Sequence, residues 1–240
     1  MIEPPPSLLP GTVHVWRIAL DDADAHRVVG PLLSADERER AQRFHRPEHR
    51  RRFTVAHGWK RRLLAAYVGQ SPDALRFECG PHGKPALVGV DAHNVHFNLS
   101  HSGGLALVAV RPGGPVGVDI ECWNRAREHF RLAQRAFSAG ERAALEALAG
   151  DADAVVAAFY DAWSRKEAYL KATGHGVTRG LHHFDVTLAP QEPARLVADR
   201  RDDQALERWR MVALTPAPDF SGALVAAAPF DELLLFDRPE

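Results

Sequence analysis

Short apolar runs and longer amphipathic stretches follow one another along the chain, and their order predicts the first elements. Residues 12–20 (TVHVWRIAL) are typical of a strand. A helix is expected to begin at Ser34, because Glu37 three residues later completes a capping box. A longer helix is predicted through the stretch RRRFTVAHGWKRRLLAAYVG, with Gly69 and Pro72 as its end signals. Four apolar runs then predict strands separated by the turn sequences GPHGKP, DAHN and HSGG, and these are LRFEC, PALVGV, VHFNLS and LALVAVR.

The second half of the sequence repeats this order. The stretch FSAGERAALEAL resembles the earlier LSADERERAQRF, so that Ser138 and Trp163 each lie 104 residues after Ser34 and Trp59. Near the C-terminus, SGALVAAAP resembles SGGLALVAVRP. An internal duplication explains both matches, and it predicts an α+β fold of two similar lobes, each a small antiparallel sheet packed with helices, related by a pseudo-twofold axis.

The turn RPGGP divides the two copies. Proline and glycine end the first predicted sheet there, so we expect an N-terminal lobe over residues 1–112 and a C-terminal lobe over residues 113–240. The junction between two lobes is a preferred place for a small-molecule site. We therefore expect the active site at the lobe interface.

Composition narrows the class of protein. The 240 residues are 45% hydrophobic and 25% charged, which fits a globular chain with a full core. Apolar runs fall short of the roughly 18 residues that a membrane span needs, and no secretion signal is visible at MIEPPPSLLPG, so we expect no membrane association. Two cysteines without CxxC spacing, Cys79 and Cys122, favour a reducing, cytoplasmic setting. The protein is expected to be a monomer.

Charge is balanced overall, with 30 basic and 31 acidic residues, but it is uneven locally. Residues 36–62 contain ten Lys or Arg against four Asp or Glu. This excess fits either a solvated helix face or an anionic ligand or partner. A nucleic-acid surface is the non-enzymatic alternative, but Phe44, Phe53 and Trp59 are spaced as the core side of a helix rather than as a stacking platform, so we expect no nucleic-acid partner.

The stretch VGVDIECW follows the predicted lobe boundary. On a strand Asp119 and Glu121 point to the same side, where two carboxylates repel each other unless a cation lies between them. A hard ion such as Mg²⁺, with Mn²⁺ as its substitute, fits these oxygen ligands. On the helix predicted over AVVAAFYDAWSRKEAYLKATG, Trp163, Glu167 and Lys171 share one face, so Glu167 is the expected third ligand. The alternatives are a strand end in solvent and a surface Glu to Lys pair.

Two further stretches carry candidate phosphate ligands. FNLSHSGG places Ser100 and His101 at the end of a predicted strand, and since a GxSxG elbow is missing, contacts to phosphate suit them better than nucleophilic catalysis. GKP places Lys84 on a fixed turn. A capped turn and a solvated lysine are the structural alternatives.

These stretches, in the order GKP, FNLSHS, VGVD, DxE and WSRKEAYLK, resemble the 4'-phosphopantetheinyl transferases of the two-lobed type that activates surfactin synthetase. The family pattern is Val/Ile-Gly-Val/Ile-Asp, followed some forty residues later by Trp/Phe-Ser/Cys/Thr-x-Lys-Glu-Ala/Ser-x-x-Lys. It is matched at every position by Val116, Gly117, Val118, Asp119, Trp163, Ser164, Lys166, Glu167, Ala168 and Lys171.

The resemblance implies transfer of the phosphopantetheine arm of coenzyme A to a serine of an apo acyl or peptidyl carrier protein, with adenosine 3',5'-bisphosphate as the leaving group. The implied metal ligands are Asp119, Glu121 and Glu167. Of these, Asp119 and Glu167 are also implied in catalysis together with Lys171, and the base is Glu167 or a water on the metal. The implied coenzyme A contacts are Arg52 and His101 near the 3'-phosphate, Lys166 and Lys171 on the phosphates, and Lys84 and Ser100.

Two departures from the family pattern stand out. Members often have Gly-Lys-Gly after the long helix, whereas this chain has His175 between two glycines, so a positive charge there depends on pH. In the N-terminal arm, family basic positions align loosely with Glu37 and Arg40, and Arg40 remains a candidate contact. A metal-dependent phosphodiesterase acting on the carrier is the alternative enzyme. The sequence leaves open which carrier is modified.

Overall fold

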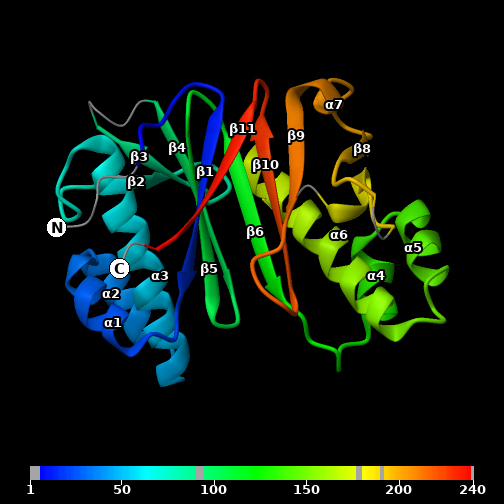
Figure 1. The fold of residues 1–240 in the computed structure, drawn as a ribbon, viewed down its shortest axis with the longest axis horizontal. Helices are drawn as coiled ribbons and strands as arrows, with labels where there is room; N and C mark the ends of the chain where they lie inside the picture. Colours follow the sequence, from blue (N-terminus) through cyan, green and yellow to red (C-terminus); the bar gives the residue numbers. More distant parts are fainter. Residues whose placement is uncertain (1–5, 90–93, 177–179, 190–191, 239–240) are drawn as a thin grey trace.

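The computed structural model describes residues 6–89, 94–176, 180–189 and 192–238. The first lobe contains, in chain order, β1 (Thr12–Ala19), α1 (Ala23–Val29), a short 3-10 helix (Gly30–Leu32), α2 (Ala35–Gln42), α3 (Pro47–Val68), β2 (Arg76–Cys79), β3 (Pro85–Val88), β4 (Val95–Ser102) and β5 (Leu105–Pro112). Four of these, α1, the 3-10 helix, α2 and α3, come between its first strand and the others. Figure 1 shows these helices gathered on the outer side of the lobe.

The second lobe repeats the order. It contains β6 (Val116–Cys122), α4 (His129–Ala136), α5 (Ala139–Glu146), α6 (Ala152–Thr173), a 3-10 helix (Leu181–His183), β7 (Phe184–Val186), β8 (Leu196–Asp199), α7 (Ala205–Arg208), β9 (Trp209–Leu214) and β10 (Phe220–Ala227). In both lobes a first strand is followed by helices, a small hairpin and a final strand pair. A last strand, β11 (Glu232–Asp237), ends the chain.

The strand orders show the duplication most clearly. The first lobe has the order β1-β5-β4 and the second has β6-β10-β9, so in each the first strand pairs antiparallel with the last, which lies between it and the last but one. Each lobe also carries a separate two-stranded sheet, β2-β3 or β7-β8. The predicted α+β class and paired lobes are therefore confirmed.

Local signals account for the principal helices. Ser34 and Ser138 each begin a helix, α2 and α5, with a complete capping box, as the sequence predicts. The long helices α3 and α6 both span 22 residues and end at Gly69 and Gly174, whose φ angles of 65° and 72° lie in the left-handed region that glycine tolerates. Sequence patterning gave no prediction for α1 or α4. The exposed Cys79 and half-buried Cys122 are free thiols.

The strand β11 joins the first sheet although it lies in the second half of the chain. It pairs in parallel with β1, so the first sheet is antiparallel except at this edge. The Phe236 ring stacks on Trp16 with centroids 4.6 Å apart, and Leu233 packs against the apolar core between the sheets. These contacts hold the end of the chain against both sheets, and Figure 1 shows β11 beginning beside β10 and crossing β1.

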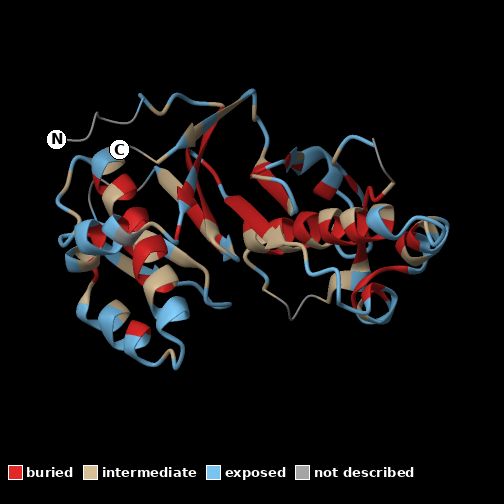
Figure 2. Ribbon diagram, turned by 60° about the horizontal axis from the view of Figure 1, so that its bottom comes forward, coloured by how far each residue is buried: buried red, intermediate tan, exposed pale blue. Residues whose placement is uncertain are grey.

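Three apolar cores stabilise the molecule. One lies between α3 and the first sheet, another surrounds α6, and a third joins the inner faces of the two sheets. Val15 and Leu107 meet Val118, Ile120 and Leu224 in this third core. Figure 2 shows the buried residues continuing from one sheet to the other. The lobes therefore form one packed body, and the polar site has to lie where β4 and β6 meet beside α6.

Within the described ranges, no helix combines the length and the apolar composition that a bilayer crossing requires.

Candidate functional site

The polar site is built on the edge of β6 that faces β4. Because β6 is the outermost strand of its sheet, the backbone groups on this side have no strand partner. Two side chains of β4 supply acceptors instead. Asn98 Oδ1 accepts from Val118 N at 2.8 Å, and Ser102 Oγ accepts from Cys122 N at 3.0 Å. The first lobe therefore supplies hydrogen-bond acceptors for two backbone amides on this edge of the second.

Two lysines satisfy carbonyl groups of the same strand. Lys84 Nζ, from the β2–β3 turn, donates to Val116 O at 2.9 Å and to Ala172 O at 3.2 Å. Lys171 Nζ, from α6, lies 3.3 Å from Val118 O. Burial lowers the pKa of Lys84 to about 8. The two ammonium groups thus lie at the lobe junction, on the strand that carries the candidate metal ligands.

Lys171, Asp119 and Ser100 form the centre of the site. Lys171 Nζ lies 2.5 Å from Asp119 Oδ1 and 2.8 Å from Ser100 Oγ, while Ser100 Oγ donates to Asp119 Oδ1 at 2.8 Å. Asp119 is 3% exposed, and its Oδ2 atom is buried without a hydrogen-bond partner in the described structure. A buried carboxylate oxygen of this kind is costly unless a further ligand satisfies it.

Two more carboxylates surround Asp119. Burial raises the pKa of Glu121 to about 7, with repulsion from Asp119 as the next cause, although a hydrogen bond from Ser102 opposes the rise. Burial and then repulsion from Asp119 also raise the pKa of Glu167, and the charge of Lys171 counteracts this. With the described residues Glu167 makes no ion pair or hydrogen bond. The three carboxylates of the site therefore outnumber the one lysine, Lys171, that forms an ion pair with them in the described structure.

Gly117 determines how closely α6 approaches β6. A Cβ atom at this position would lie 2.2 Å from Ala168 O and 2.3 Å from Ala172 N, which is far too close for any side chain. The absence of a side chain lets the helix backbone pack directly on the strand. Since Glu167 and Lys171 lie on this part of α6, the close approach is what brings them to Asp119.

The residues present partly fit a divalent cation. Oxygen donors are the right chemistry, and the unpartnered Asp119 Oδ2 is an available ligand atom. However, among the described residues no three His, Cys, Asp or Glu side chains are already arranged to hold a metal ion. The other Asp119 oxygen is bonded to Lys171 and Ser100. A cation at the free Oδ2 atom would therefore complete its ligand set with Glu121, Glu167, water or oxygens of a bound phosphate.

A cavity of about 220 Å³ opens beside these groups. It is bounded by Lys84 and the β2–β3 turn of the first lobe, and by Asn98, Glu167 and Lys171 near the junction. A larger hollow of about 710 Å³ lies next to it and shares the Gly83 and Pro85 segment of the turn. Because they share this segment, the two hollows adjoin, and the smaller one reaches Lys171.

Lys166 does not reach this site. It is 0% exposed, and its ammonium lies 2.8 Å from Glu141 Oε2 and donates to Phe184 O at 2.6 Å and Leu181 O at 2.9 Å. These partners lie in the core of the second lobe. The structure therefore does not support a coenzyme A contact from Lys166, because consecutive helix residues point about 100° apart and Glu167 takes the direction toward Asp119.

The expected 3'-phosphate ligands lie near the β4–β5 turn. His101 is exposed on β4. Arg52 already bonds two carboxylates, at 2.6 Å from Asp21 and 2.7 Å from Glu48. A Cβ added to Gly104 would lie 2.8 Å from Asp21 Oδ2 and 3.9 Å from Arg52 Nη2, so both side chains pack against the turn that follows His101. A phosphate at Arg52 would have to compete with these carboxylates.

The basic segment of residues 36–62 divides into two groups. Lys60 and Arg61 are buried and pair with Glu37, at 2.8 Å and 2.5 Å, so they are part of the fold. Burial alone would raise the pKa of Glu37, but hydrogen bonds from His57 and the charges of Lys60 and Arg61 outweigh it and hold that pKa below its ordinary value. Glu37 is thus the counterpart of Glu141 in the second capping box, and with Lys60 and Arg61 it forms part of the wall of the larger hollow. Exposed arginines, including Arg46, remain on the surface.

Sequence reasoning did not identify Asn98, Ser102 and Gly117 as site residues. A signal for the first two was present, since Asn98, Ser100 and Ser102 alternate in FNLSHS and alternate strand residues share a side. Gly117 stood inside the VGVD motif, where glycine in a strand often marks a close backbone approach.

His175, which stands where family members often have a lysine, lies near the junction cavity. Its ring centroid is 6.1 Å from that of His82, which lines the cavity.

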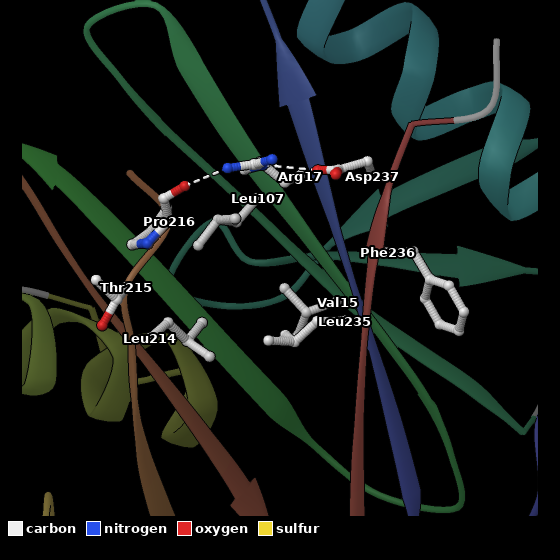
Figure 3. A pocket seen from close by; sticks show the side chains of 9 residues that line it. All are labelled: Val15, Arg17, Leu107, Leu214, Thr215, Pro216, Leu235, Phe236 and Asp237. Atoms are coloured by element: carbon white, nitrogen blue, oxygen red, sulfur yellow. Dashed lines mark hydrogen bonds and ion pairs between the residues drawn. The ribbon is translucent and has the colours of Figure 1, made fainter. Parts of the chain in front are cut away.

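A third hollow, of about 240 Å³, lies between the lobes, and Asp119, Glu121 and Glu167 are not among the residues that line it (Figure 3). Val15, Leu107 and Leu235 line its apolar floor, and Arg17 spans its rim by donating to Asp237 at 2.7 Å and to Pro216 O at 2.5 Å. Figure 3 shows no further charged group among the residues drawn. The hollow has no connection to the proposed chemistry.

Comparison with known proteins gives the class. A family model described as the 4'-phosphopantetheinyl transferase superfamily matches residues 115–228, and one described as the N-terminal part of 4'-phosphopantetheinyl transferase matches residues 22–113. The chain belongs to the 4'-phosphopantetheinyl transferase family, as the motifs predicted, and it is an enzyme of that type. The alternatives of a phosphodiesterase and of a nucleic-acid-binding module find no support.

Particular relatives agree with this assignment. The chain is 38% identical over 226 residues to 4'-phosphopantetheinyl transferase HetI of a Nostoc species, covering 93% of this chain and 91% of that protein. It is 33% identical over 180 residues to 4'-phosphopantetheinyl transferase psf-1 of Bacillus pumilus, covering 74% of each chain. It is 32% identical over 157 residues to 4'-phosphopantetheinyl transferase Sfp of Bacillus subtilis, covering 65% of this chain and 67% of that protein.

Proposed function

We propose that this transferase moves the 4'-phosphopantetheine arm of coenzyme A to a serine hydroxyl of an apo acyl or peptidyl carrier protein. The reaction depends on Mg²⁺, which Mn²⁺ can replace, and releases adenosine 3',5'-bisphosphate. The serine oxygen forms a bond to the phosphorus that carries pantetheine, and the bond from that phosphorus to the bridging oxygen breaks. The observation that carries the proposal is the Lys171–Asp119–Ser100 cluster beside the junction cavity, in a chain of this family.

The position of the Lys171 ammonium supports a role for this residue in neutralising charge during transfer. Phosphoryl transfer is promoted mainly by positioning and by cations near the non-bridging and leaving oxygens. Asp119 and Ser100 fix the Lys171 ammonium at the cavity wall before any ligand arrives. A fixed cation needs little reorganisation when charge develops, so Lys171 stabilises the transition state more than a solvated lysine would.

The carboxylates serve two purposes in this proposal. Asp119 Oδ2, with Glu121 and Glu167, would hold the divalent cation, which when bound neutralises the diphosphate. Glu167 also lies in the wall of the cavity. We propose that Glu167, or a water on the cation, accepts the proton of the attacking serine.

The remaining contacts follow the cavity. Lys84 and Lys171 lie on two sides of it, so they would bind the diphosphate, with Ser100 holding Lys171. His101 and Arg52 would bind the 3'-phosphate near the β4–β5 turn. Arg52 would then exchange a carboxylate for a phosphate, which offers a second bidentate acceptor for the guanidinium.

The direct test is to incubate the purified protein with coenzyme A, Mg²⁺ and a panel of apo carrier proteins, and to read each carrier by intact mass. The proposal expects a mass increase of one phosphopantetheine on at least one carrier, blocked by excess chelator and by Ser→Ala replacement of the carrier's modified serine. Adenosine 3',5'-bisphosphate should appear in equal amount. Transfer that continues undiminished in chelator would overturn the metal dependence.

A further inference from the structure

Ser102 is the last of the three polar residues that alternate along β4. The first, Asn98, bonds only the backbone of β6, and the second, Ser100, bonds the side chains of Asp119 and Lys171. Ser102 does both, because its hydroxyl accepts from Cys122 N at 3.0 Å and lies 3.1 Å from Glu121 Oε2. It is therefore bonded at once to the strand and to a carboxylate carried by that strand.

The chemistry of a hydroxyl gives this arrangement a direction. A serine oxygen has one hydrogen to donate. Since the Cys122 amide can only donate, it occupies a lone pair of Ser102 Oγ and fixes the position of the oxygen. The single hydrogen is then free for the Glu121 carboxylate, which accepts. A change of Glu121 rotamer would break this hydrogen bond.

Glu121 depends on its hydrogen bond with Ser102 more than Asp119 depends on any single partner. Asp119 is held by both Ser100 and Lys171. Among the described residues, Ser102 is the one hydrogen-bond partner of the Glu121 side chain, and no lysine or arginine forms an ion pair with it. The Oε1 atom of Glu121 is left available, while Oε2 is occupied.

We infer that Ser102 is a positioning residue that holds Glu121 in the orientation needed to bind the divalent cation. The inference rests on the proposed metal dependence of the transferase. Groups that orient metal ligands in this way commonly change metal affinity by about 10- to 100-fold when removed. The hydroxyl itself touches neither substrate nor metal.

The test measures metal binding without turnover. Mn²⁺ is titrated into the complex of the enzyme with coenzyme A, with no carrier present, by calorimetry and by electron paramagnetic resonance. Coenzyme A affinity is measured separately in chelator. Ser102→Ala is compared with Ser102→Thr, which keeps the hydroxyl, and with Ser102→Cys, which keeps the volume but donates weakly.

Ser221→Ala is the matched control. Ser221 lies opposite Glu121 on β10, is 1% exposed, and its hydroxyl donates to Asp161 Oδ1 at 2.6 Å and accepts from Trp123 Nε1 at 2.9 Å. Its removal therefore deletes a buried hydroxyl with two hydrogen bonds from the adjacent strand without removing a hydrogen bond of Glu121.

We expect Ser102→Ala to weaken Mn²⁺ binding by about 10- to 100-fold, with coenzyme A affinity in chelator changed less than twofold. Ser102→Cys should move in the same direction, whereas Ser102→Thr and Ser221→Ala should bind Mn²⁺ like the wild type. Wild-type Mn²⁺ affinity in Ser102→Ala and Ser102→Cys would overturn the inference about Ser102 and leave the proposed metal dependence standing. An equal loss in Ser221→Ala would overturn it too, since general destabilisation would explain both. A wild-type complex that takes up no Mn²⁺ or Mg²⁺ would overturn the metal dependence and the inference together.

Discussion

Lys171 Nζ lies 2.5 Å from Asp119 Oδ1, while the other oxygen of the same carboxylate is buried without a partner in the described structure. One side of Asp119 is thus neutralised by the protein and the other side is left for a ligand. This division explains why the family motif couples an aspartate on a strand to a lysine at the C-terminal end of a helix. Each holds the other in place, and repulsion from Asp119 still raises the pKa of Glu121 and of Glu167, next to the effect of burial.

Replacing Asp119 by Asn keeps the shape of the side chain and removes its charge. We expect kcat/KM to fall by about 100-fold or more, because both the orientation of Lys171 and an oxygen ligand are weakened. The melting temperature should change little, since Glu121 and Glu167 lose a repelling neighbour and the side chain of Lys171 is 27% exposed and can be hydrated. Steady-state kinetics with an apo carrier and thermal unfolding measure the two effects. Asp237→Asn, at an exposed pair with Arg17, is the control. Full activity in Asp119→Asn would contradict the proposed site.

Lys166 and Lys171 belong to one motif, but replacing Lys166 should mainly lower stability, whereas replacing Lys171 should mainly lower activity. Lys166→Ala leaves Glu141 buried without its cation, so we expect a loss of about 3–5 kcal/mol of unfolding free energy. Lys171→Ala should cost far less stability, because the side chain is partly exposed, but should greatly lower kcat. Urea unfolding and single-turnover transfer separate the two.

A double variant tests the assignment of Lys166 further. Lys166→Met with Glu141→Gln removes both charges, so it should recover part of the stability that Lys166→Ala loses. It should also regain transfer activity in proportion to the folded fraction. A stable double variant that stays inactive would instead assign Lys166 to the chemistry.

The contrast between these two lysines shows which parts of the site could be predicted from the sequence. The helical period correctly put Glu167 and Lys171 on one face, and strand alternation put Asp119 and Glu121 on one side, because both rules depend on local geometry. The direction of Lys166 follows from the same helical period, but the family motif alone suggested a phosphate contact. The pairing of β11 with β1 could not be predicted, since the choice of partner strand depends on contacts between distant segments.

Gly117 is expected to tolerate no side chain. In Gly117→Ala the new methyl group would collide with the α6 backbone at Ala168 and Ala172, so strand and helix must move apart. We expect a loss of about 1–3 kcal/mol of stability, as for overpacked cores. Transfer should fall by about 100-fold, because misplacement on the order of 1 Å is enough for that. Gly140→Ala, where no atom lies closer than 4.0 Å to the new Cβ, is the control and should retain both. Wild-type kcat in Gly117→Ala would show that the close approach is not needed.

Acid should destabilise the fold through His57. Burial is the main cause that lowers the pKa of His57 to about 4, against the attraction of Glu37 and with help from Lys60 and Arg40. Between the unfolded value of 6.5 and about 4, the unfolded chain binds a proton that the folded protein refuses, so stability is lost as pH falls through this window.

From pH 7.5 to pH 5 this histidine alone should remove about 2 kcal/mol of unfolding free energy. Urea unfolding at a series of pH values measures the slope. His57→Gln cannot be protonated, so its slope between pH 6.5 and pH 5 should be smaller than that of the wild type. Parallel curves for the two proteins would show that His57 is readily protonated in the fold.

The partner surface is the last prediction, and the structure changes which residues test it. Arg61 is buried against Glu37, so reversing its charge would place two carboxylates together in the core and unfold the first lobe. Arg46 and Arg50 are exposed at the start of α3 and serve instead. Carriers of this class are, by the family resemblance, commonly acidic near the modified serine, so their charge should speed encounter with this surface.

Arg46→Glu with Arg50→Glu should therefore lower the association rate of an acidic apo carrier several-fold at low salt and flatten its dependence on ionic strength. Coenzyme A affinity should stay unchanged, because neither side chain lines the junction cavity. The same charge change in the second lobe, Arg135→Glu with Arg195→Glu, is the control, since both residues are exposed and α4, which carries Arg135, lies on the side of that lobe away from the first (Figure 1). Stopped-flow association at several salt concentrations decides the matter. Equal rates and equal salt slopes for the two double variants would mean that the carrier docks on another surface.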